Sequence, residues 1–462
     1  MNVVEQMRKF IEPKSIAILG VPRQSGEGTR NILGNLLSYG YKGKMYPVNP
    51  NASEILGVKT YRRVADIEVN DIDLAVINLP RPLVVGTARE CIEKGIPSIV
   101  ISTQGFGDAS DDEGKRLQKE LDALVKKSGT RIIGPNTYGT INGFINFSTA
   151  FVRMYLSREP VGIICQTGGF FNGIPGLKGI GKGIDLGNSC DVDFADAMEY
   201  FRQDDEVKVV ILHIEGTRNG GRFIKAAKRL AQKKPVIALK AGMSEAGARA
   251  IQSHSGSIVG KGEVWSTALA QSGIIRVDDL DEIIDLVPAF LVLPSMKGRG
   301  IGITTNSGGV GTLCADACYK YNMEVARLSP ASVKRLTPLF PSWLNVRNPL
   351  DSVPASLVQR QTFNTVLTEF MNTLLSDDGV DAVLYISVAP FGERLTELRD
   401  GLIKLIEAYP DKPIVCSFQG RYAEETKVEL EKSGKIVVYH NPARAIRALA
   451  RLRQYSAFRK GF

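Results

Sequence analysis

The sequence has 462 residues, which is too long for one hydrophobic core, so we expect two or three domains. Its hydrophobic fraction of 44% is ordinary for a globular protein, and no apolar run reaches the ~20 residues needed to span a bilayer. The first residues lack the cationic-then-apolar pattern of an export signal. A cytoplasmic protein without a membrane partner is therefore expected.

The charge and the cysteines narrow the class of ligand. The formal net charge is +9, but basic residues are spread along the chain without aromatic–basic alternation, so we expect no nucleic-acid partner. A polyanionic small molecule, such as a nucleotide or coenzyme A, accounts for the charge equally well. Of the six cysteines only Cys314 and Cys318 lie close together, and no further ligand cluster accompanies them. Reduced thiols and no metal site are expected.

The first predicted unit is a strand, a loop and a helix. Residues 15–20 form an apolar run that ends in glycine, a glycine-rich loop follows, and residues 31–37 begin an amphipathic helix. This order is the setting in which backbone N–H groups hold phosphate. The dinucleotide fingerprint G-x-G-x-x-G is not met, because Gly26 and Gly28 are followed by Asn31. A plain connecting loop is an equally good interpretation of the loop taken alone.

The same rhythm continues along the first third of the chain. Further strands are predicted at residues 44–50, 73–80, 98–102 and 131–136. Strands that alternate with helical patterns at this spacing predict a doubly wound parallel sheet. We place the end of this domain near Asn146. The acidic run at 108–113 is interpreted as the solvated start of a helix.

Two later segments open in the same way and predict an internal repeat. The apolar run 160–165 leads into Gln166-Thr167-Gly168-Gly169, and the run 300–305 leads into Asn306-Ser307-Gly308-Gly309. Each copy then carries a second matching strand followed by a Lys-Pro strand. The second and third domains are therefore interpreted as diverged copies of one unit.

The two copies differ where chemistry is expected. The first copy has Glu215 where the second has Val388, and only the first carries Gln252-Ser253-His254-Ser255-Gly256-Ser257. His254 is one of three histidines, lies among small hydroxyl residues and is expected in a loop. An imidazole can be a general base, a metal ligand or a phosphoryl carrier. The second domain is therefore the candidate site.

Glu215 and His254 follow successive predicted strands, the second of which ends at Lys240-Ala241-Gly242. Strand ends of a parallel sheet meet at one edge, where ligands of such folds bind. A carboxylate that accepts Nδ1–H from the imidazole fixes its tautomer and leaves Nε2 as a nucleophile. Ser255 and Gly256 could then hold a phosphate. Too few potential ligands converge here to bind a metal ion. A serine hydrolase is also disfavoured, because the Gly-x-Ser-x-Gly nucleophile elbow that such enzymes carry before a helix is missing.

Three other features of the sequence can be interpreted either as sites or as purely structural elements. Gln166-Thr167-Gly168-Gly169 is either an anion site at a helix start or a tight turn. Residues 176–183 nearly match a P-loop, but Gly183 replaces the hydroxyl that holds Mg²⁺, so an NTPase loop is rejected. His213, inside an apolar strand, is interpreted as structural.

These residues together resemble the α subunits of ADP-forming acyl-CoA synthetases, which are related to succinyl-CoA synthetase. The resemblance covers nearly the whole chain, and the combination of its short motifs is highly specific. The motifs are Gly20-Val21-Pro22 with the loop to Gly28, Tyr46-Pro47-Val48-Asn49-Pro50, Gln104-Gly105-Phe106, Gly134-Pro135-Asn136, Gly187-Asn188, Ile214-Glu215-Gly216, Ser253-His254-Ser255-Gly256 and Asn348-Pro349-Leu350-Asp351.

The resemblance implies an α/β fold with three domains. Residues 1–146 would form a Rossmann-like CoA-binding domain, 147–294 a flavodoxin-like ligase domain with the phosphohistidine, and 295–462 a second, degenerate flavodoxin-like domain. The implied reaction is acyl-CoA + ADP + phosphate ⇌ carboxylate + ATP + CoA, through an acyl phosphate and phospho-His254. Glu215 matches the glutamate that orients the histidine.

The resemblance also assigns binding residues. The implied phosphate-binding residues are Gln166, Thr167, Gly168, Gly169, Ser255 and Gly256. The implied CoA-binding residues are Gly20, Pro22, Arg23, Ser25, Gly26, Gly28, Lys44, Asn49, Pro50, Pro80, Ser102, Thr103 and Asn136. Where the family usually has Ser-Gln-Ser-Gly-Ala, this chain has Cys165-Gln166-Thr167-Gly168-Gly169 and then two phenylalanines, so a different acyl preference is expected.

Nothing in the chain resembles an ATP-grasp module. The resemblance therefore implies a separate ATP-grasp β subunit that holds ADP or ATP with Mg²⁺, in an α2β2 assembly that acts on CoA and a small carboxylic acid. Two alternatives are a CoA-sensing protein without turnover and an acyl-CoA-linked transferase that needs neither ADP nor phosphate.

Overall fold

The computed structural model describes residues 2–24, 30–255, 262–359 and 363–461. The chain forms two compact units, residues 1–280 and 281–462, and each is described by itself. Within the described ranges, none of the helices combines the length and the apolar character that a membrane span requires.

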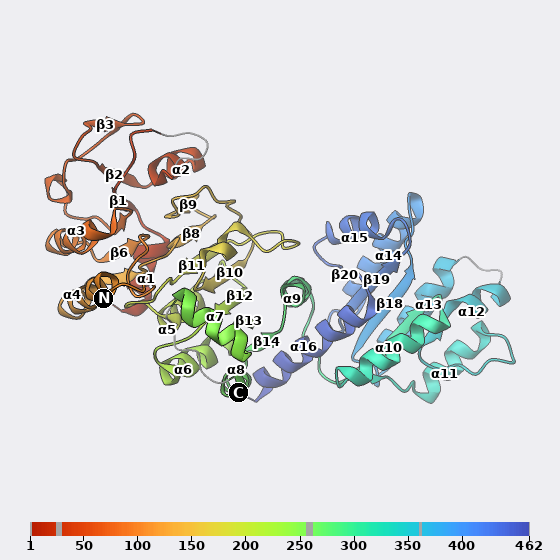
Figure 1. Cartoon of the computed structure of the whole chain (residues 1–462). Helices are drawn as coiled ribbons and strands as arrows, with labels where there is room; N and C mark the ends of the chain where they lie inside the picture. Colours follow the sequence, from red (N-terminus) through yellow and green to blue (C-terminus); the bar gives the residue numbers. More distant parts are fainter. Residues whose placement is uncertain (1, 25–29, 256–261, 360–362, 462) are drawn as a thin grey trace. The chain divides into compact units, whose positions relative to one another are not determined.

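The first sheet of unit 1 is parallel throughout. It lies in the red and orange part of the chain in Figure 1. Its strands, in spatial order, are β2 (Lys44–Val48), β1 (Ser15–Leu19), β5 (Leu74–Ile77), β6 (Ser98–Ile101) and β7 (Arg131–Ile133). The inner strands β1, β5 and β6 are largely apolar because both faces of a parallel sheet are buried there. The associated helices are α1 (Val3–Ile11), α2 (Ile32–Tyr39), α3 (Arg81–Glu93) and α4 (Asp112–Lys127).

The packing of the first sheet follows from strand alternation. Ala75 and Ile77 of β5 lie in one core cluster with Val84 and Ala88 of α3 and with Leu121 of α4. Successive strand residues point to opposite faces, so the residues between them face the other side of the sheet. The short connections β3 (Glu54–Ile55), β4 (Val58–Lys59) and η1 (Val64–Asp66) lie between β2 and β5.

The second sheet of unit 1 has the order β14, β13, β12, β10, β11, β8, β9. Its strands are β14 (Ile275–Val277), β13 (Val236–Lys240), β12 (Val209–Ile214), β10 (Val161–Cys165), β11 (Lys182–Asp185), β8 (Thr140–Asn142) and β9 (Phe147–Ser148). All are parallel except β8 and β9, which add an antiparallel edge. Strand β8 thus belongs to the second sheet although it precedes residue 146, the predicted end of the first domain. The predicted limits of the three domains stay predictions.

The elements between these strands include the segments that carry the candidate site. They are η2 (Gly168–Asn172), α5 (Phe194–Gln203), α6 (Gly220–Ala231), α7 (Glu245–Ser255) and α8 (Gly262–Gln271). His254 therefore lies in α7 by its backbone, and the expectation of a loop at this residue is wrong. The physical reason is the alanine-rich segment that precedes it, because alanine has the highest helix propensity.

Unit 2 contains one sheet with the order β16, β15, β18, β19, β20, and β17 pairs with β15. The strands are β15 (Gly300–Thr305), β16 (Glu324–Val325), β17 (Leu350–Asp351), β18 (Ala382–Val388), β19 (Ile414–Gln419) and β20 (Val437–Tyr439). The helices are α9 (Leu280–Val292), α10 (Gly308–Lys320), α11 (Pro330–Leu336), η3 (Thr337–Leu339), α12 (Ser352–Gln359), α13 (Phe363–Ser376), α14 (Glu393–Ala408), α15 (Ala423–Glu431) and α16 (Pro442–Lys460).

The strand order supports the internal repeat. In the second sheet the parallel strands run β14, β13, β12, β10, β11, and in the third they run β20, β19, β18, β15, β16. In each copy the first of these strands in chain order, β10 or β15, therefore lies between the second (β11 or β16) and the third (β12 or β18). Strand β18 of the third sheet thus matches β12 of the second sheet. It ends at Val388, whose side chain is exposed (60%).

The near P-loop segment ends in a buried ion pair. Lys182, the first residue of β11, is 1% exposed. Its ammonium group donates hydrogen bonds to the Asp204 carboxylate, to the Tyr200 hydroxyl (3.0 Å) and to Glu12 (3.3 Å). A P-loop lysine must be free to reach phosphate, and this one is already paired. The rejection of an NTPase loop agrees with this geometry.

Replacing Lys182 with methionine should destabilise the protein. The substitution leaves the buried Asp204 carboxylate without its cation, and breaking one side of a buried pair costs about 3–5 kcal/mol of unfolding free energy. Urea denaturation followed by circular dichroism measures the loss. Lys178→Met, an exposed lysine of the same segment, is the control and should change stability by less than ~0.5 kcal/mol. Equal losses of stability in the two variants would contradict the assignment of Lys182 to a stabilising buried ion pair with Asp204.

Candidate functional site

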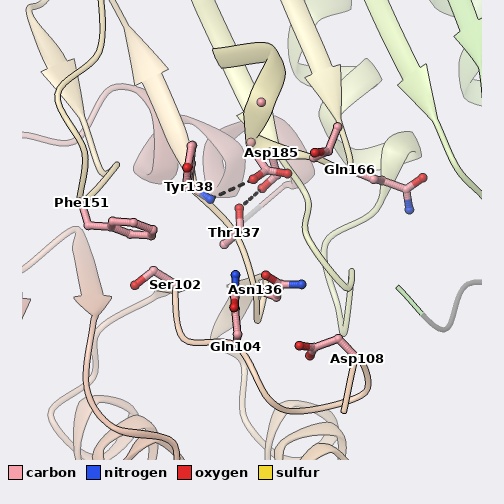
Figure 2. A pocket seen from close by; sticks show the side chains of 12 residues that line it. Ser102, Gln104, Asp108, Asn136, Thr137, Tyr138, Phe151, Gln166 and Asp185 are labelled. Carbon is pink, nitrogen blue, oxygen red and sulfur yellow. Dashed lines mark hydrogen bonds between the residues drawn. The ribbon is translucent and has the colours of Figure 1, made fainter. Parts of the chain in front are cut away.

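A cavity of about 380 Å³ lies where the strand ends of the first sheet meet those of the second. Figure 2 shows Ser102, Gln104 and Asn136 on one side, and Gln166 and Asp185 on the other. The full lining is Ser102, Gln104, Asp108, Asn136, Thr137, Tyr138, Phe151, Gln166, Thr167, Gly168, Gly169 and Asp185. The wall is mostly polar, which suits an anionic or carbonyl-bearing ligand.

The cavity brings two predicted sets of residues together. Ser102 and Asn136 were expected to bind CoA, and Gln166 to Gly169 were expected to bind phosphate. They reach one cavity because all of them follow parallel strands, β6 and β7 of the first sheet and β10 of the second. A thioester presented by the first set would thus face an anion held by the second.

The residues from the first sheet are fixed by their own backbone contacts. The Ser102 hydroxyl donates to the Ile77 carbonyl oxygen at 3.1 Å, and the Thr103 hydroxyl donates to the Leu79 carbonyl oxygen at 2.7 Å. Asn136 has φ of 61°, and its N–H donates to the Thr103 carbonyl oxygen at 3.0 Å. Asparagine tolerates this left-handed conformation better than most residues. The strand ends β6 and β7 are thereby tied together.

The turn after β10 needs glycine at one defined place. A Cβ atom on Gly168 would lie 2.5 Å from Cδ2 of Tyr138, closer than van der Waals contact allows. Gly168 therefore lets the start of η2 approach the Tyr138 ring, which in turn packs edge to face on Phe151 at 5.0 Å between ring centroids. The cavity has one aromatic wall in an otherwise polar lining.

Gln166 connects this cavity to Glu215. Its side-chain oxygen accepts hydrogen bonds from the backbone N–H groups of Glu215 (2.8 Å) and Gly216 (3.0 Å). The amide oxygen is therefore used to hold the end of β12 against the end of β10. Its NH₂ group is the part that remains to donate to an anion, as a phosphate ligand requires.

Asp185 is a cavity residue that the sequence analysis did not identify. It ends β11, is 1% exposed, and its carboxylate accepts N–H bonds from Tyr138 (2.8 Å) and Gly187 (3.2 Å), the first of which is drawn in Figure 2. Burial raises the pKa of Asp185 to about 6, and the charge of Glu215 adds to the rise. The signal of Asp185 in the sequence is its position at a strand end, shortly after the segment 176–183 that nearly matches a P-loop.

Asp108 was interpreted as part of a solvated helix start, but it lines the cavity. The helix itself begins later, at Asp112. The Asp108 carboxylate accepts bonds from the N–H groups of Gly105 (2.9 Å) and Phe106 (3.0 Å) and from the side chain of Asn188 (2.7 Å). Burial acts to raise the pKa of Asp108, but these hydrogen bonds outweigh it and hold the pKa below its usual value.

Glu215 lies directly after β12 and is 5% exposed. Its Oε2 atom is buried and has no hydrogen-bond partner among the residues that the structure describes. A buried carboxylate oxygen without a donor is costly, so this atom marks a position where a donor is required. An imidazole N–H would satisfy it.

The predicted phosphoryl carrier is placed only by its backbone. His254 and Ser255 are the last residues of α7, and their side chains are not described. Gly256 lies outside the described residues. Their roles stay predictions. Among the described residues, groups of three or more potential metal ligands do not occur, and the expectation of no metal site also stays a prediction.

The predicted CoA set is brought together only in part. Gly20 follows β1 with φ of 92°, and a Cβ atom there would lie 2.1 Å from the Asn78 carbonyl oxygen. Asn49 follows β2 and donates to the Val21 carbonyl oxygen at 2.8 Å, which places the loop start with Pro22 and Arg23 at the same sheet edge. Pro50 follows Asn49, and Pro80 is the N-cap of α3. Ser25, Gly26 and Gly28 lie outside the described residues.

Lys44 is separated from the rest of this set. It is the first residue of β2 and pairs with Ser15, the first residue of β1. In parallel strands these positions lie at the amino edge of the sheet, opposite the edge that carries the cavity. The structure therefore does not support a shared site for Lys44 and Ser102.

His213 agrees with its structural interpretation. It is 7% exposed within β12, and its ring stacks on Phe170 with 4.5 Å between ring centroids. Burial lowers the pKa of His213 to about 4, and the charge of Lys240 lowers it further. The ring is thus neutral near pH 7 and supports the turn that carries Gly168 and Gly169.

Comparison with protein families assigns a class to two of the domains. Residues 14–143 match the family described as CoA binding domain, and residues 158–290 match the family described as succinyl-CoA ligase like flavodoxin domain. The predicted fold class is confirmed by these matches together with the parallel sheets. A CoA-binding domain followed by this flavodoxin-like domain defines a ligase of the succinyl-CoA ligase class.

Relatives that match nearly the whole of this chain narrow the class to one family. The chain is 38% identical to the α subunit of ADP-forming acetate–CoA ligase II from Pyrococcus furiosus, with 94% of each chain covered. It is 35% identical to an ADP-forming acetate–CoA ligase of Methanocaldococcus jannaschii, of which it spans only 63%. A solved structure of a "dinucleotide forming Acetyl-coenzyme A synthetase 1" from Ca. Korarchaeum cryptofilum, in complex with phosphate and ADP, superposes with a TM-score of 0.85 at 28% identity and covers 99% of this chain and 98% of that one. The chain belongs to the ADP-forming acyl-CoA synthetases, and it corresponds to their α subunit.

Proposed function

We propose that this α subunit converts acyl-CoA and phosphate into a carboxylate and CoA while its phosphorylated His254 passes the phosphoryl group to ADP. The observation that supports this most directly is the cavity shared by Ser102 and Asn136 with Gln166 and Thr167. It lets a thioester and a phosphate meet within one polar space. Phosphate attack on the thioester carbonyl forms an acyl phosphate and releases the CoA thiolate.

The chain's own groups have defined tasks in this proposal. Backbone N–H groups at the start of η2, the Thr167 hydroxyl and the Gln166 NH₂ bind the phosphate oxygens. Oε2 of Glu215 accepts Nδ1–H of His254, which leaves Nε2 to attack the acyl phosphate. The P–O bond to the acyl group breaks as the N–P bond forms, and the carboxylate leaves.

A separate ATP-grasp β subunit completes the proposed reaction. It would hold ADP or ATP with Mg²⁺ and accept the phosphoryl group from His254, in an α2β2 assembly in the cytoplasm. Two comparisons support a division of labour. The P. furiosus relative is an α subunit of which the match covers 94%, and the match covers only 63% of the M. jannaschii relative, which leaves more than a third of that protein outside it.

Reconstitution tests the proposal. The purified chain, an ATP-grasp partner, ADP, phosphate and a panel of acyl-CoA thioesters should yield ATP and free CoA only when all components are present. The chain alone should bind CoA in isothermal titration calorimetry and form no ATP. CoA binding without turnover by the pair would instead support a CoA-sensing protein. CoA transfer without ADP and phosphate would support a transferase.

A further inference from the structure

Lys240, the last residue of β13, is a buried cation beside Glu215. It is 5% exposed, so its ammonium group lies in the protein interior. Strand β13 pairs in parallel with β12, and the register places Lys240 opposite Ile214, the residue before Glu215. Lysine is rarely buried without a charged partner or a specific task, so this position needs an explanation.

The hydrogen bonds of Lys240 reach the end of β12 and the segment that leads to α7. Its Nζ donates to the backbone carbonyl oxygen of Glu215 at 2.9 Å and to that of Ala241. The ammonium also lies 5.1 Å from the ring centroid of Trp265 in α8, within the range of a cation–π contact. One side chain thus fixes the backbone of Glu215 relative to the start of the segment that carries His254.

The charge of Lys240 complements the Glu215 carboxylate. The two groups attract each other electrostatically, while Oε2 of Glu215 keeps no hydrogen-bond donor among the described residues. The ammonium therefore compensates the buried negative charge without occupying the atom that an imidazole would need. A nearby unlike charge makes a buried carboxylate less costly.

We propose that Lys240 is a positioning residue for phosphoryl transfer, which holds the Glu215 strand end and balances its carboxylate while Oε2 remains available to His254. This inference rests on the proposed function of Glu215 and His254. Lys240 touches neither phosphate nor thioester in this assignment, and it acts through Glu215.

The proposal predicts a particular dependence on pH. Burial lowers the pKa of Lys240 to about 8, and the Glu215 carboxylate opposes that effect. The positive charge is therefore present below this pH and is lost as pH rises through it. Among the described residues, Lys240 also interacts with the Trp265 ring on α8 and, through its charge, with His213 on β12. The rate of His254 phosphorylation should fall above about pH 8 because the charge balance is lost.

The test is a pH profile of single-turnover phosphorylation in the complex of the chain with its partner subunit. Lys240→Met should lower the rate on the order of tenfold or more, the size of coupling seen between contacting residues, and should remove the fall near pH 8. Lys240→Arg should keep its charge and move that fall to higher pH. A Lys240→Met profile that retains the parental fall would overturn the proposal.

A matched control and a double-mutant cycle separate positioning from general stability. Lys234 lies just before the other end of β13, also has a pKa lowered to about 8 by burial, and donates to the carbonyl oxygens of Phe201 and Asp204. Lys234→Met should leave the pH profile unchanged. In a Glu215→Gln background, Lys240→Met should lower the phosphorylation rate little further, because the carboxylate on which Lys240 acts is already gone. Additive losses of rate in the double variant would refute the positioning role of Lys240. Normal labelling of His254→Ala would refute the proposed function instead.

Discussion

Replacing His254 with alanine should abolish transfer of labelled phosphate to this chain. When the parent chain is incubated with acyl-CoA and radioactive phosphate in the presence of its partner, the label should be acid-labile and base-stable, as a phosphoramidate is. The alanine variant has no ring nitrogen to carry the phosphoryl group, so neither label nor ATP should form. Denaturing electrophoresis after acid and base treatment measures the label.

His440 provides a control that is matched in residue type. It follows β20 in unit 2, its side chain is 48% exposed, and its Nδ1 lies 2.9 Å from Glu424. His440→Ala should label as well as the parent chain, which shows that losing a histidine as such has no effect. Label that persists in His254→Ala would remove the phosphohistidine from the mechanism, whatever the family of the chain.

Most of the fold could be predicted from the sequence because parallel sheets give strong local signals. The strand that becomes β12 is apolar at every position except His213 because helices cover both faces of such a sheet. For the same reason β5 is apolar throughout, and β1 is apolar apart from Ser15. The antiparallel edge formed by β8 and β9 was not predicted. These strands have three and two residues, too few for a period to be visible in the sequence.

Site residues could be predicted where a short sequence motif indicates their chemistry. They could not be predicted where the site depends on contacts between residues that are far apart in the sequence. Gln166 was identified as an anion ligand from the glycines that follow it, yet its bonds to the N–H groups of Glu215 and Gly216 link residues about fifty positions apart. Asp185 and Asp108 look like ordinary strand-end and helix-start residues. Only the folded chain shows that both line one cavity with Thr167.

The internal repeat gives the comparison that isolates Glu215. Strands β12 and β18 occupy the same place in sheets of the same order, yet the first is followed by a buried carboxylate and the second ends in the exposed side chain of Val388. A carboxylate is therefore not needed to build this strand end. It is present in one copy alone, and its Oε2 atom has no hydrogen-bond partner among the described residues, which is why we propose a chemical task for it.

Replacing Glu215 with glutamine should slow phosphorylation of His254 by about 10²–10⁴-fold, the range typical of losing a positioned proton-accepting group. Glutamine keeps the shape of the side chain but removes its charge. Its amide oxygen can still accept Nδ1–H, but a neutral amide stabilises the positive charge that develops on the imidazole less than a carboxylate does, and its NH₂ group, turned towards Nδ1, would favour the other tautomer. Single-turnover labelling measures the rate, and the KM for CoA should stay close to the parental value because the proposed CoA residues lie on the first sheet. Glu263→Gln, an exposed glutamate on α8, is the control. A Glu215→Gln rate within about twofold of the parent would show that the carboxylate does not orient His254, since loss of a positioned catalytic contact costs far more than that.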